Sequence, residues 1–171
     1  VWLESSVFNT QEANSLLKKN KTTKVLLEVD RLRTSPLSEK NDFFAKLMQS
    51  DVYFTVKEAI LNQIKKEKFE DKKELLLLAL QTNNAQVRQA VASNLTKIPE
   101  DLRVSYESLL DDQSYHTQEI ALFALWNNFP SRRFQYLDKS KNWNGFNDYN
   151  LRTLWLSLAL NTPNYADNKE N

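Results

Sequence analysis

The chain has 171 residues, a net charge of +1, no Cys, one His, one Gly and four Pro. Without Cys it has no disulfide and no thiolate metal site, and the single His116 nearly excludes a His-based metal site. Acids and bases are interspersed, so no general field attracts nucleic acid or an anionic membrane. Tight hairpins need Gly at positive φ, whereas helices joined by polar loops do not, so the composition favours an all-α protein.

Apolar residues at helical spacing, separated by short polar loops, predict a run of helix pairs. The predicted pairs are 9–18 with 22–33, 39–49 with 52–66, 71–81 with 85–97, 100–110 with 115–128, and 131–139 with 147–160. Residues 1–8 are expected to form an apolar cap or a link to another domain, and residues 164–171 have the composition of a frayed tail. The longest apolar run, Leu75 to Leu80, is too short to span a bilayer.

Local signals predict where these helices begin. Ser38 is expected to cap the helix that follows it, and Asp71-x-x-Glu74 reads as a capping box. Pro99 and Pro130 suit first turns of the helices that follow them. The Lys- and Glu-rich segment from residue 64 to residue 74 is expected to be a solvated connection and not a nucleic-acid patch.

One segment is repeated along the chain. VKEAILNQI at residues 56–64 returns as VRQAVASNL at 87–95 and, more faintly, as TQEIALFAL at 117–125. Ala59, Ala90 and Ala121 recur at equal intervals, where a small residue would let a neighbouring helix approach closely. Repeats of this length predict a single α-solenoid domain over residues 1–163, a right-handed α-α superhelix of about five HEAT/ARM-like helix pairs.

Few residues suggest chemistry. His116 at a helix start is expected to be exposed or capping, and Asp111 and Asp112 look like loop and N-cap residues. Aromatic residues crowd the last two units, as a packed end cap or as one wall of a binding groove. No residue is predicted to be catalytic or to bind a metal.

Six stretches together resemble a known family. They are WLESSVF, EANSLLKKN, LRTSPLSEK, SDVYFTVKEAILNQI, SYHTQEIALFALWNNFPSRRFQYLD and GFNDYNLRTLWLSLAL. As a set they resemble the C-terminal helical region of aminopeptidase N-like zinc metallopeptidases (peptidase family M-one) of Bacteroidetes type, over about residues 1–163. The resemblance implies a parent hydrolase whose separate upstream domain holds Zn through H-E-x-x-H and a downstream Glu. No such motif occurs in this chain, so no cofactor is expected here.

The resemblance implies a non-catalytic domain that covers the active-site cleft and shapes peptide access. Its expected partners are the upstream catalytic domain and peptide substrates, with no nucleic acid and no membrane insertion. Candidate substrate contacts are Arg88, Arg103 and Arg152, because a cation would attract a peptide carboxylate. The compartment stays open, and the cell envelope or periplasm would suit such a parent.

Two alternatives remain. The chain could be a free-standing HEAT-repeat scaffold for protein–protein interaction. It could also be a HEAT-like enzyme acting on alkylated DNA, although its near-neutral charge argues against that function. An upstream H-E-x-x-H in the parent gene separates the aminopeptidase hypothesis from the scaffold.

Overall fold

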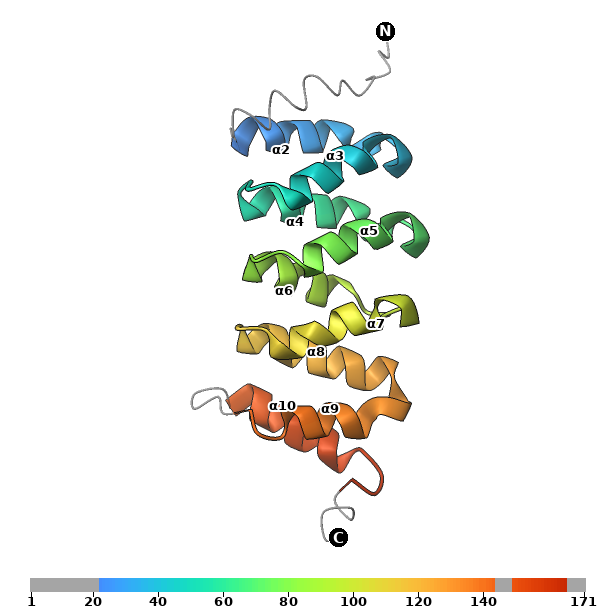
Figure 1. Cartoon of the computed structure of the whole chain (residues 1–171), viewed down its shortest axis with the longest axis vertical. Helices are drawn as coiled ribbons and strands as arrows, with labels where there is room; N and C mark the ends of the chain where they lie inside the picture. The colour runs from blue at the N-terminus through green and yellow to red at the C-terminus, as the bar shows by residue number, and fades with distance from the viewer. Residues whose placement is uncertain (1–21, 144–148, 166–171) are drawn as a thin grey trace, which may run out of the picture. The chain divides into compact units, whose positions relative to one another are not determined.

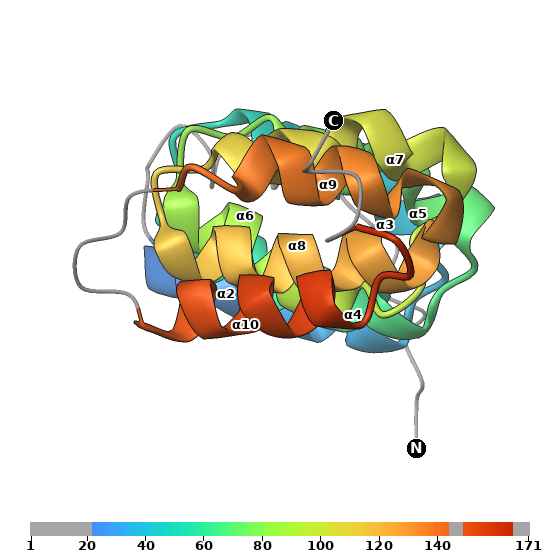
Figure 2. The same cartoon turned by 90° about the horizontal axis from the view of Figure 1, so that it is seen from below.

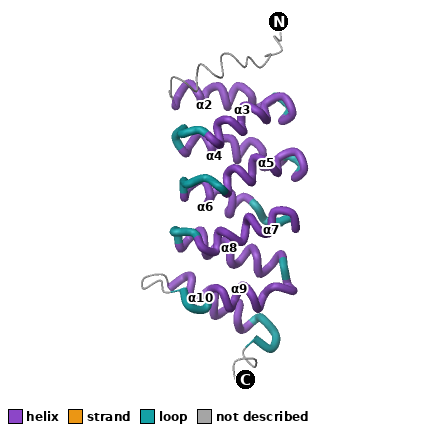
Figure 3. The backbone as a smooth tube through the Cα atoms, in the orientation of Figure 1, coloured by secondary structure: helices purple, strands orange, loops and turns teal. Residues whose placement is uncertain are grey.

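The computed structural model describes residues 22–143 and 149–165, and every regular element in these ranges is a helix (Figure 1). The backbone tube shows only helices and loops in the described part (Figure 3). The all-α prediction is therefore confirmed. The predicted helix 9–18 and the apolar segment 1–8 lie outside the described residues.

The observed helices follow the predicted pairs closely. The α-helices are α2 (Thr22–Arg31), α3 (Leu37–Gln49), α4 (Phe54–Gln63), α5 (Phe69–Leu80), α6 (Ala85–Asn94), α7 (Glu100–Glu107), α8 (Tyr115–Asn128), α9 (Arg133–Ser140) and α10 (Tyr149–Leu160). Short 3-10 turns follow or precede them: η1 (Leu32–Thr34), η2 (Ile64–Lys66), η3 (Ser108–Asp111) and η4 (Pro130–Arg132). We call α3, α5, α7 and α9 first helices and α2, α4, α6, α8 and α10 second helices.

The chain divides into two compact units, Val1–Ala90 and Val91–Asn171, with the boundary inside α6. In unit 1, α2 packs beside α4 and α3 beside α5, so the helices form two layers. In unit 2, α8 packs beside α10 in one layer, and α7 and α9 form the other (Figure 2). Each interface is filled by buried aliphatic and aromatic side chains such as Phe44, Ile60, Tyr106 and Leu125. The continuous right-handed superhelix over residues 1–163 stays a prediction.

A basic residue occupies the fourth position of three first helices: Lys40, Lys72 and Arg103. Lys40 Nζ donates to the Leu32 carbonyl of η1 at 2.8 Å, and Lys72 Nζ donates to the Lys65 carbonyl of η2 at 2.8 Å. Carbonyl groups at the end of a helical turn attract cations, so each lysine fastens the preceding turn to its own helix. Burial lowers the pKa of both lysines.

This contact corrects one expectation about the segment 64–74. Lys65, Lys66 and Lys68 are exposed, as expected of a solvated connection. Lys72 is instead half-buried and bound to the backbone of the turn before it. The Lys72 contact joins the first turn of α5 to η2. This part of the segment is therefore a packed corner of the fold.

The predicted N-caps are wrong for α3 and α5. These helices begin earlier than expected, after Pro36 and Lys68, and neither cap residue offers a side-chain hydrogen bond. Ser38 and Asp71 consequently fall inside the first turn, where Asp71 still interacts favourably with the helix dipole. Pro99 is the N-cap residue of α7, one position before the expected first turn. Pro130 opens η4 as the first residue of that turn.

The corner before α8 is organised by two polar residues. Ser114 is the N-cap, and its Oγ accepts from the Thr117 amide at 3.3 Å. Asp112 is buried, and its Oδ1 accepts from the Ser114 amide at 2.9 Å. Asp112 therefore shapes the loop and is not itself the cap, while Asp111 is exposed and pairs with Lys139 at 2.6 Å.

The three evenly spaced alanines do not occupy equivalent sites. Ala121 is fully buried, but Ala59 and Ala90 are only half-buried. The second helices α4, α6 and α8 begin at residues 54, 85 and 115. The interval between helix starts is therefore one residue shorter from α6 to α8 than from α4 to α6. Ala121 therefore matches Val91 in register, and only this alanine lies on the fully packed face.

Asn128 of α8 holds the corner between α6 and α7. Its Oδ1 accepts from the Ile98 amide at 3.0 Å, and its Nδ2 donates to the Thr96 carbonyl at 3.3 Å and the Ala124 carbonyl at 2.8 Å. One amide side chain thus satisfies two backbone groups of an irregular segment.

The start of the expected frayed tail is ordered. Tyr165 is 4% exposed, and its ring contacts Phe134 and Trp155. Its hydroxyl donates to Asp138 Oδ1 at 3.0 Å. The expectation is therefore wrong for residue 165, which completes the core beside α9 and α10, and residues 166–171 lie outside the described residues.

Candidate functional site

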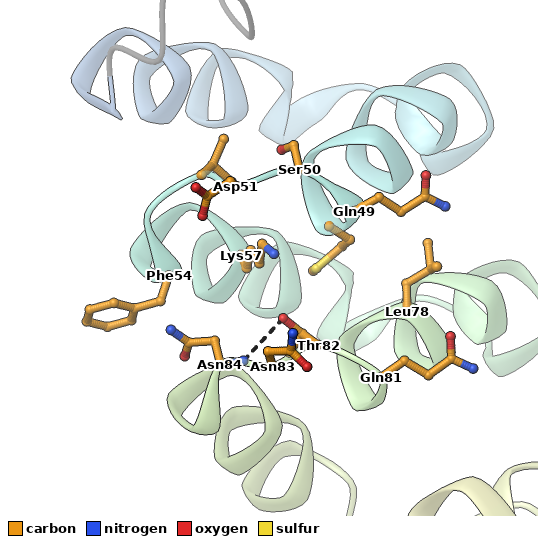
Figure 4. Close-up of a pocket in the computed structure, with 12 residues that line it drawn as sticks. Gln49, Ser50, Asp51, Phe54, Lys57, Leu78, Gln81, Thr82, Asn83 and Asn84 are labelled. Carbon is orange, nitrogen blue, oxygen red and sulfur yellow. Dashed lines mark hydrogen bonds between the residues drawn. The ribbon is translucent and has the colours of Figure 1, made fainter.

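A polar pocket of about 590 Å³ opens in unit 1 where two helix corners meet. We call it the corner pocket. Its lining residues are Met48, Gln49, Ser50, Asp51, Val52, Phe54, Lys57, Leu78, Gln81, Thr82, Asn83 and Asn84. Figure 4 shows Lys57 of α4 between the corner that carries Ser50 and Asp51 and the corner that carries Thr82 and Asn83.

Lys57 is the distinctive group of this pocket. Its side chain is 7% exposed, and its ammonium has no hydrogen-bond partner among the described residues. Burial lowers the pKa of Lys57, and the negative charge of Asp51 partly opposes that shift. Asp51 is exposed and makes no direct ion pair with Lys57 within the described part of the chain. Lys57 Nζ is not among the buried unpartnered atoms of the described residues, so the ammonium faces the water of the pocket and keeps its donors available.

Three exposed amide side chains belong to the same pocket. Gln49, Gln81 and Asn83 line the pocket, and none has a side-chain hydrogen bond to another described residue. Gln49 and Gln81 lie 32 residues apart at the ends of successive first helices, so the repeat presents the same group twice. Each amide offers both a donor and an acceptor.

The fourth residue of each second helix explains why Lys57 is unusual. Arg88 Nη1 in α6 donates to the Thr82 carbonyl at 2.7 Å, and Gln118 Nε2 in α8 donates to the Asp112 carbonyl at 2.7 Å. Both side chains fasten the corner just before their own helix. Arg152 in α10 reaches back to the Lys141 carbonyl at 3.4 Å. Lys57 occupies the same position but points into the corner pocket without such a contact.

The three arginines predicted to contact substrate have contacts within the fold. Arg88 binds the corner before α6, as just described. Arg103 pairs with Glu100 at 2.5 Å and with Glu107 at 2.7 Å, and Glu107 also accepts from the Tyr136 hydroxyl. The Arg152 guanidinium lies 4.8 Å from the centre of the Trp155 ring. None of the three lines the corner pocket, and their contact with a substrate stays a prediction.

Unit 2 has a separate, mainly apolar groove of about 520 Å³. It lies between α8 and the C-terminal half of α6, with Leu154 of α10 at one side. Phe123 is 52% exposed there, and His116 and Glu119 form a polar end, with 3.5 Å between Nδ1 and Oε2. His116 is thus exposed, as expected. The groove could hold an apolar side chain, but it has no buried polar group that would select one ligand.

The aromatic residues late in the chain divide between core and surface. Tyr136 and Trp155 are buried, whereas Tyr115 and Phe134 are exposed together with Phe123. Arg133 stacks on Trp126 at 3.6 Å, and its Nε donates to the Trp126 carbonyl at 3.0 Å. Tyr136 and Trp155 therefore belong to the core, while Tyr115, Phe123 and Phe134 lie at the surface.

Among the described residues, no three His, Cys, Asp or Glu side chains converge where a metal ion could be held. Within the same ranges, none of the helices combines the length and apolarity needed to cross a bilayer. No family model, no curated protein and no solved structure matches the chain.

Sequence reasoning identified the repeat that positions this site but missed Lys57. The sequence does contain a signal for Lys57, since Lys57 and Arg88 occupy the same place in the repeated segments VKEA and VRQA. Only the geometry distinguishes the basic residue that binds its own corner from the one that does not.

Proposed function

We propose that this chain is a helical-repeat module that binds polypeptide segments at its corners. The observation that supports this function is the set of unpaired amides in the corner pocket, presented by successive repeats. An extended polypeptide offers alternating carbonyl and N–H groups, and side-chain amides can bond both. Neighbouring helices lie about 10 Å apart, which corresponds to about three residues of extended chain.

A binding assay with labelled, unstructured peptides tests this function. We expect the double variant Gln81→Ala with Asn83→Ala to weaken binding about tenfold, because two hydrogen bonds are lost. Gln113→Ala is the matched control, since Gln113 occupies the position of Asn83 in the next repeat and lies in unit 2. Equal binding by all three proteins would refute the assignment of this pocket.

The sequence resemblance supports a more specific proposal, in which the module is the C-terminal domain of a zinc aminopeptidase. In that setting it would cover the catalytic cleft of the upstream domain and limit which peptides enter. The parent reading frame tests this proposal directly, because it must encode H-E-x-x-H upstream. Without that motif, the free-standing interaction scaffold is the better description.

A further inference from the structure

Within the described part of the chain, the ammonium of Lys57 makes no hydrogen bond that fastens the fold. In the next repeats, Arg88 and Gln118 satisfy the carbonyl of their own corner at 2.7 Å in both cases. Lys57 has the same place on its helix and is more than nine-tenths buried, yet it has no hydrogen-bond partner among the described residues. Its Nζ atom still reaches the water of the pocket, so its N–H donors are available to a ligand.

The surroundings of Lys57 favour an anion with a single charge. The N-cap residue Tyr53 makes no side-chain cap hydrogen bond, and Lys57 lies in the first turn of α4, so the positive end of the helix dipole adds to the potential near the ammonium. Asp51 lies exposed at the rim and carries the opposite charge. Asp51 repels any anion, and it repels a doubly charged phosphate about twice as strongly as a singly charged carboxylate. A carboxylate can accept from Lys57 with one oxygen and leave the other for the amides.

We propose that the corner pocket binds the carboxylate of a polypeptide, with Lys57 as its counter-ion. This inference rests on the proposed polypeptide binding and specifies its chemistry. The carboxylate can come from a chain terminus or from an Asp or Glu side chain, since both present the same planar group. Gln49 and Gln81 line the same pocket and would bond the backbone next to the carboxylate.

Four probes separate these sources in titrations with the 171-residue chain. They are an acetylated tri-alanine with a free carboxylate, the same peptide with an amidated end, an amidated peptide with a central Glu, and inorganic phosphate. We expect one or both carboxylate peptides to bind at least about tenfold more tightly than the neutral peptide. Phosphate should bind no better than the neutral peptide.

Two variants locate the effect. Lys57→Met should remove the preference for carboxylate and reduce the affinity at least about tenfold. Lys46→Met is the matched control, because Lys46 is an exposed lysine on α3 in the same unit, and it should leave the affinity unchanged. The amide resonances of residues 49–57 and 81–84 should shift on binding in the wild type and stay in place in Lys57→Met.

The outcomes distinguish the two proposals. Peptides that bind equally well with and without a carboxylate would overturn the role of Lys57 but leave polypeptide binding intact. If no peptide binds, yet acetate shifts the Lys57 side-chain resonances, the carboxylate site stands and polypeptide binding fails. Tighter binding of phosphate than of any carboxylate, or an unchanged Lys57→Met variant, would overturn the carboxylate site.

Discussion

The residues Lys40 and Lys57 are both largely buried, at 2% and 7% exposure, but within the described ranges only Lys40 has hydrogen-bond acceptors. Lys40 Nζ donates to the Leu32 carbonyl at 2.8 Å and to Gln63 Oε1 at 3.3 Å. Met has a similar length and no charge. Replacing each lysine by Met should therefore change the free energy of unfolding in opposite directions.

For Lys40→Met, we expect a loss of about 2 kcal/mol, because a hydrogen bond from a charged donor is removed and the Leu32 carbonyl loses a partner. For Lys57→Met, we expect a gain of about 1 kcal/mol, because the burial that lowers the pKa of Lys57 disfavours its charge and no acceptor among the described residues is orphaned. In a chain of this size these changes correspond to a Tm lower by about 4–8 °C and higher by about 2–4 °C.

Urea unfolding at neutral pH, followed by circular dichroism, measures both changes. Lys46→Met should stay within about 0.5 kcal/mol of wild type, since this lysine is exposed. A Lys57→Met variant that loses as much stability as Lys40→Met would refute the reasoning, because it would mean that the Lys57 ammonium stabilises the free fold.

The pH dependence gives an independent check. Burial lowers the pKa of Lys57 below the ordinary lysine value of 10.5, so the folded state disfavours the ammonium. The charged ammonium therefore destabilises the folded state fully at pH values below the lowered pKa, and this destabilisation disappears as the pH rises toward 10.5. The stability advantage of Lys57→Met over wild type should therefore shrink at alkaline pH, and subtracting the two curves cancels the contribution of the tyrosines.

Three further changes test the packing. Asn128→Ala should cost about 1–3 kcal/mol, because it orphans backbone groups of the corner between α6 and α7, while the exposed neighbour Asn127→Ala should cost under about 0.5 kcal/mol in the same unfolding assay. Ala121→Leu should destabilise the fold by about 1–3 kcal/mol through overpacking, because Ala121 is fully buried. Ala90→Leu should lose less stability, because Ala90 is only half-buried. Equal losses would contradict the assignment of Ala121, and not Ala90, to the fully packed face. Burial and a hydrogen bond to a carboxylate raise the pKa of Tyr165 to about 12. The contribution of Tyr165 to stability is therefore complete below the unfolded pKa near 10 and is lost as the pH rises toward 12. Tyr165→Phe should flatten that part of the pH–stability curve.

The sequence by itself determined the helical class and the order of the elements. Apolar spacing along 56–64 and 87–95, with polar residues between, is a local property of the chain, so the observed helices α4 and α6 lie where it predicts. Helix starts were less well determined. Ser38 and Asp71 can cap a helix, but α3 and α5 begin earlier, directly after the corners that Lys40 and Lys72 fasten.

Tertiary structure alone decided which repeated positions are equivalent in environment. The fourth position of α4, α6 and α8 holds Lys57, Arg88 and Gln118, yet the surroundings of these side chains differ. The repeat in the sequence likewise aligns Ala59 with Ala121, although only Ala121 is fully buried. The physical reason is that packing decides which atoms a side chain reaches. Arg88 and Gln118 each reach a carbonyl of the corner before their own helix, whereas Lys57 lines a pocket that the corner of Thr82 and Asn83 completes. A repeat pattern fixes the direction of a side chain, and packing between elements fixes what that side chain meets.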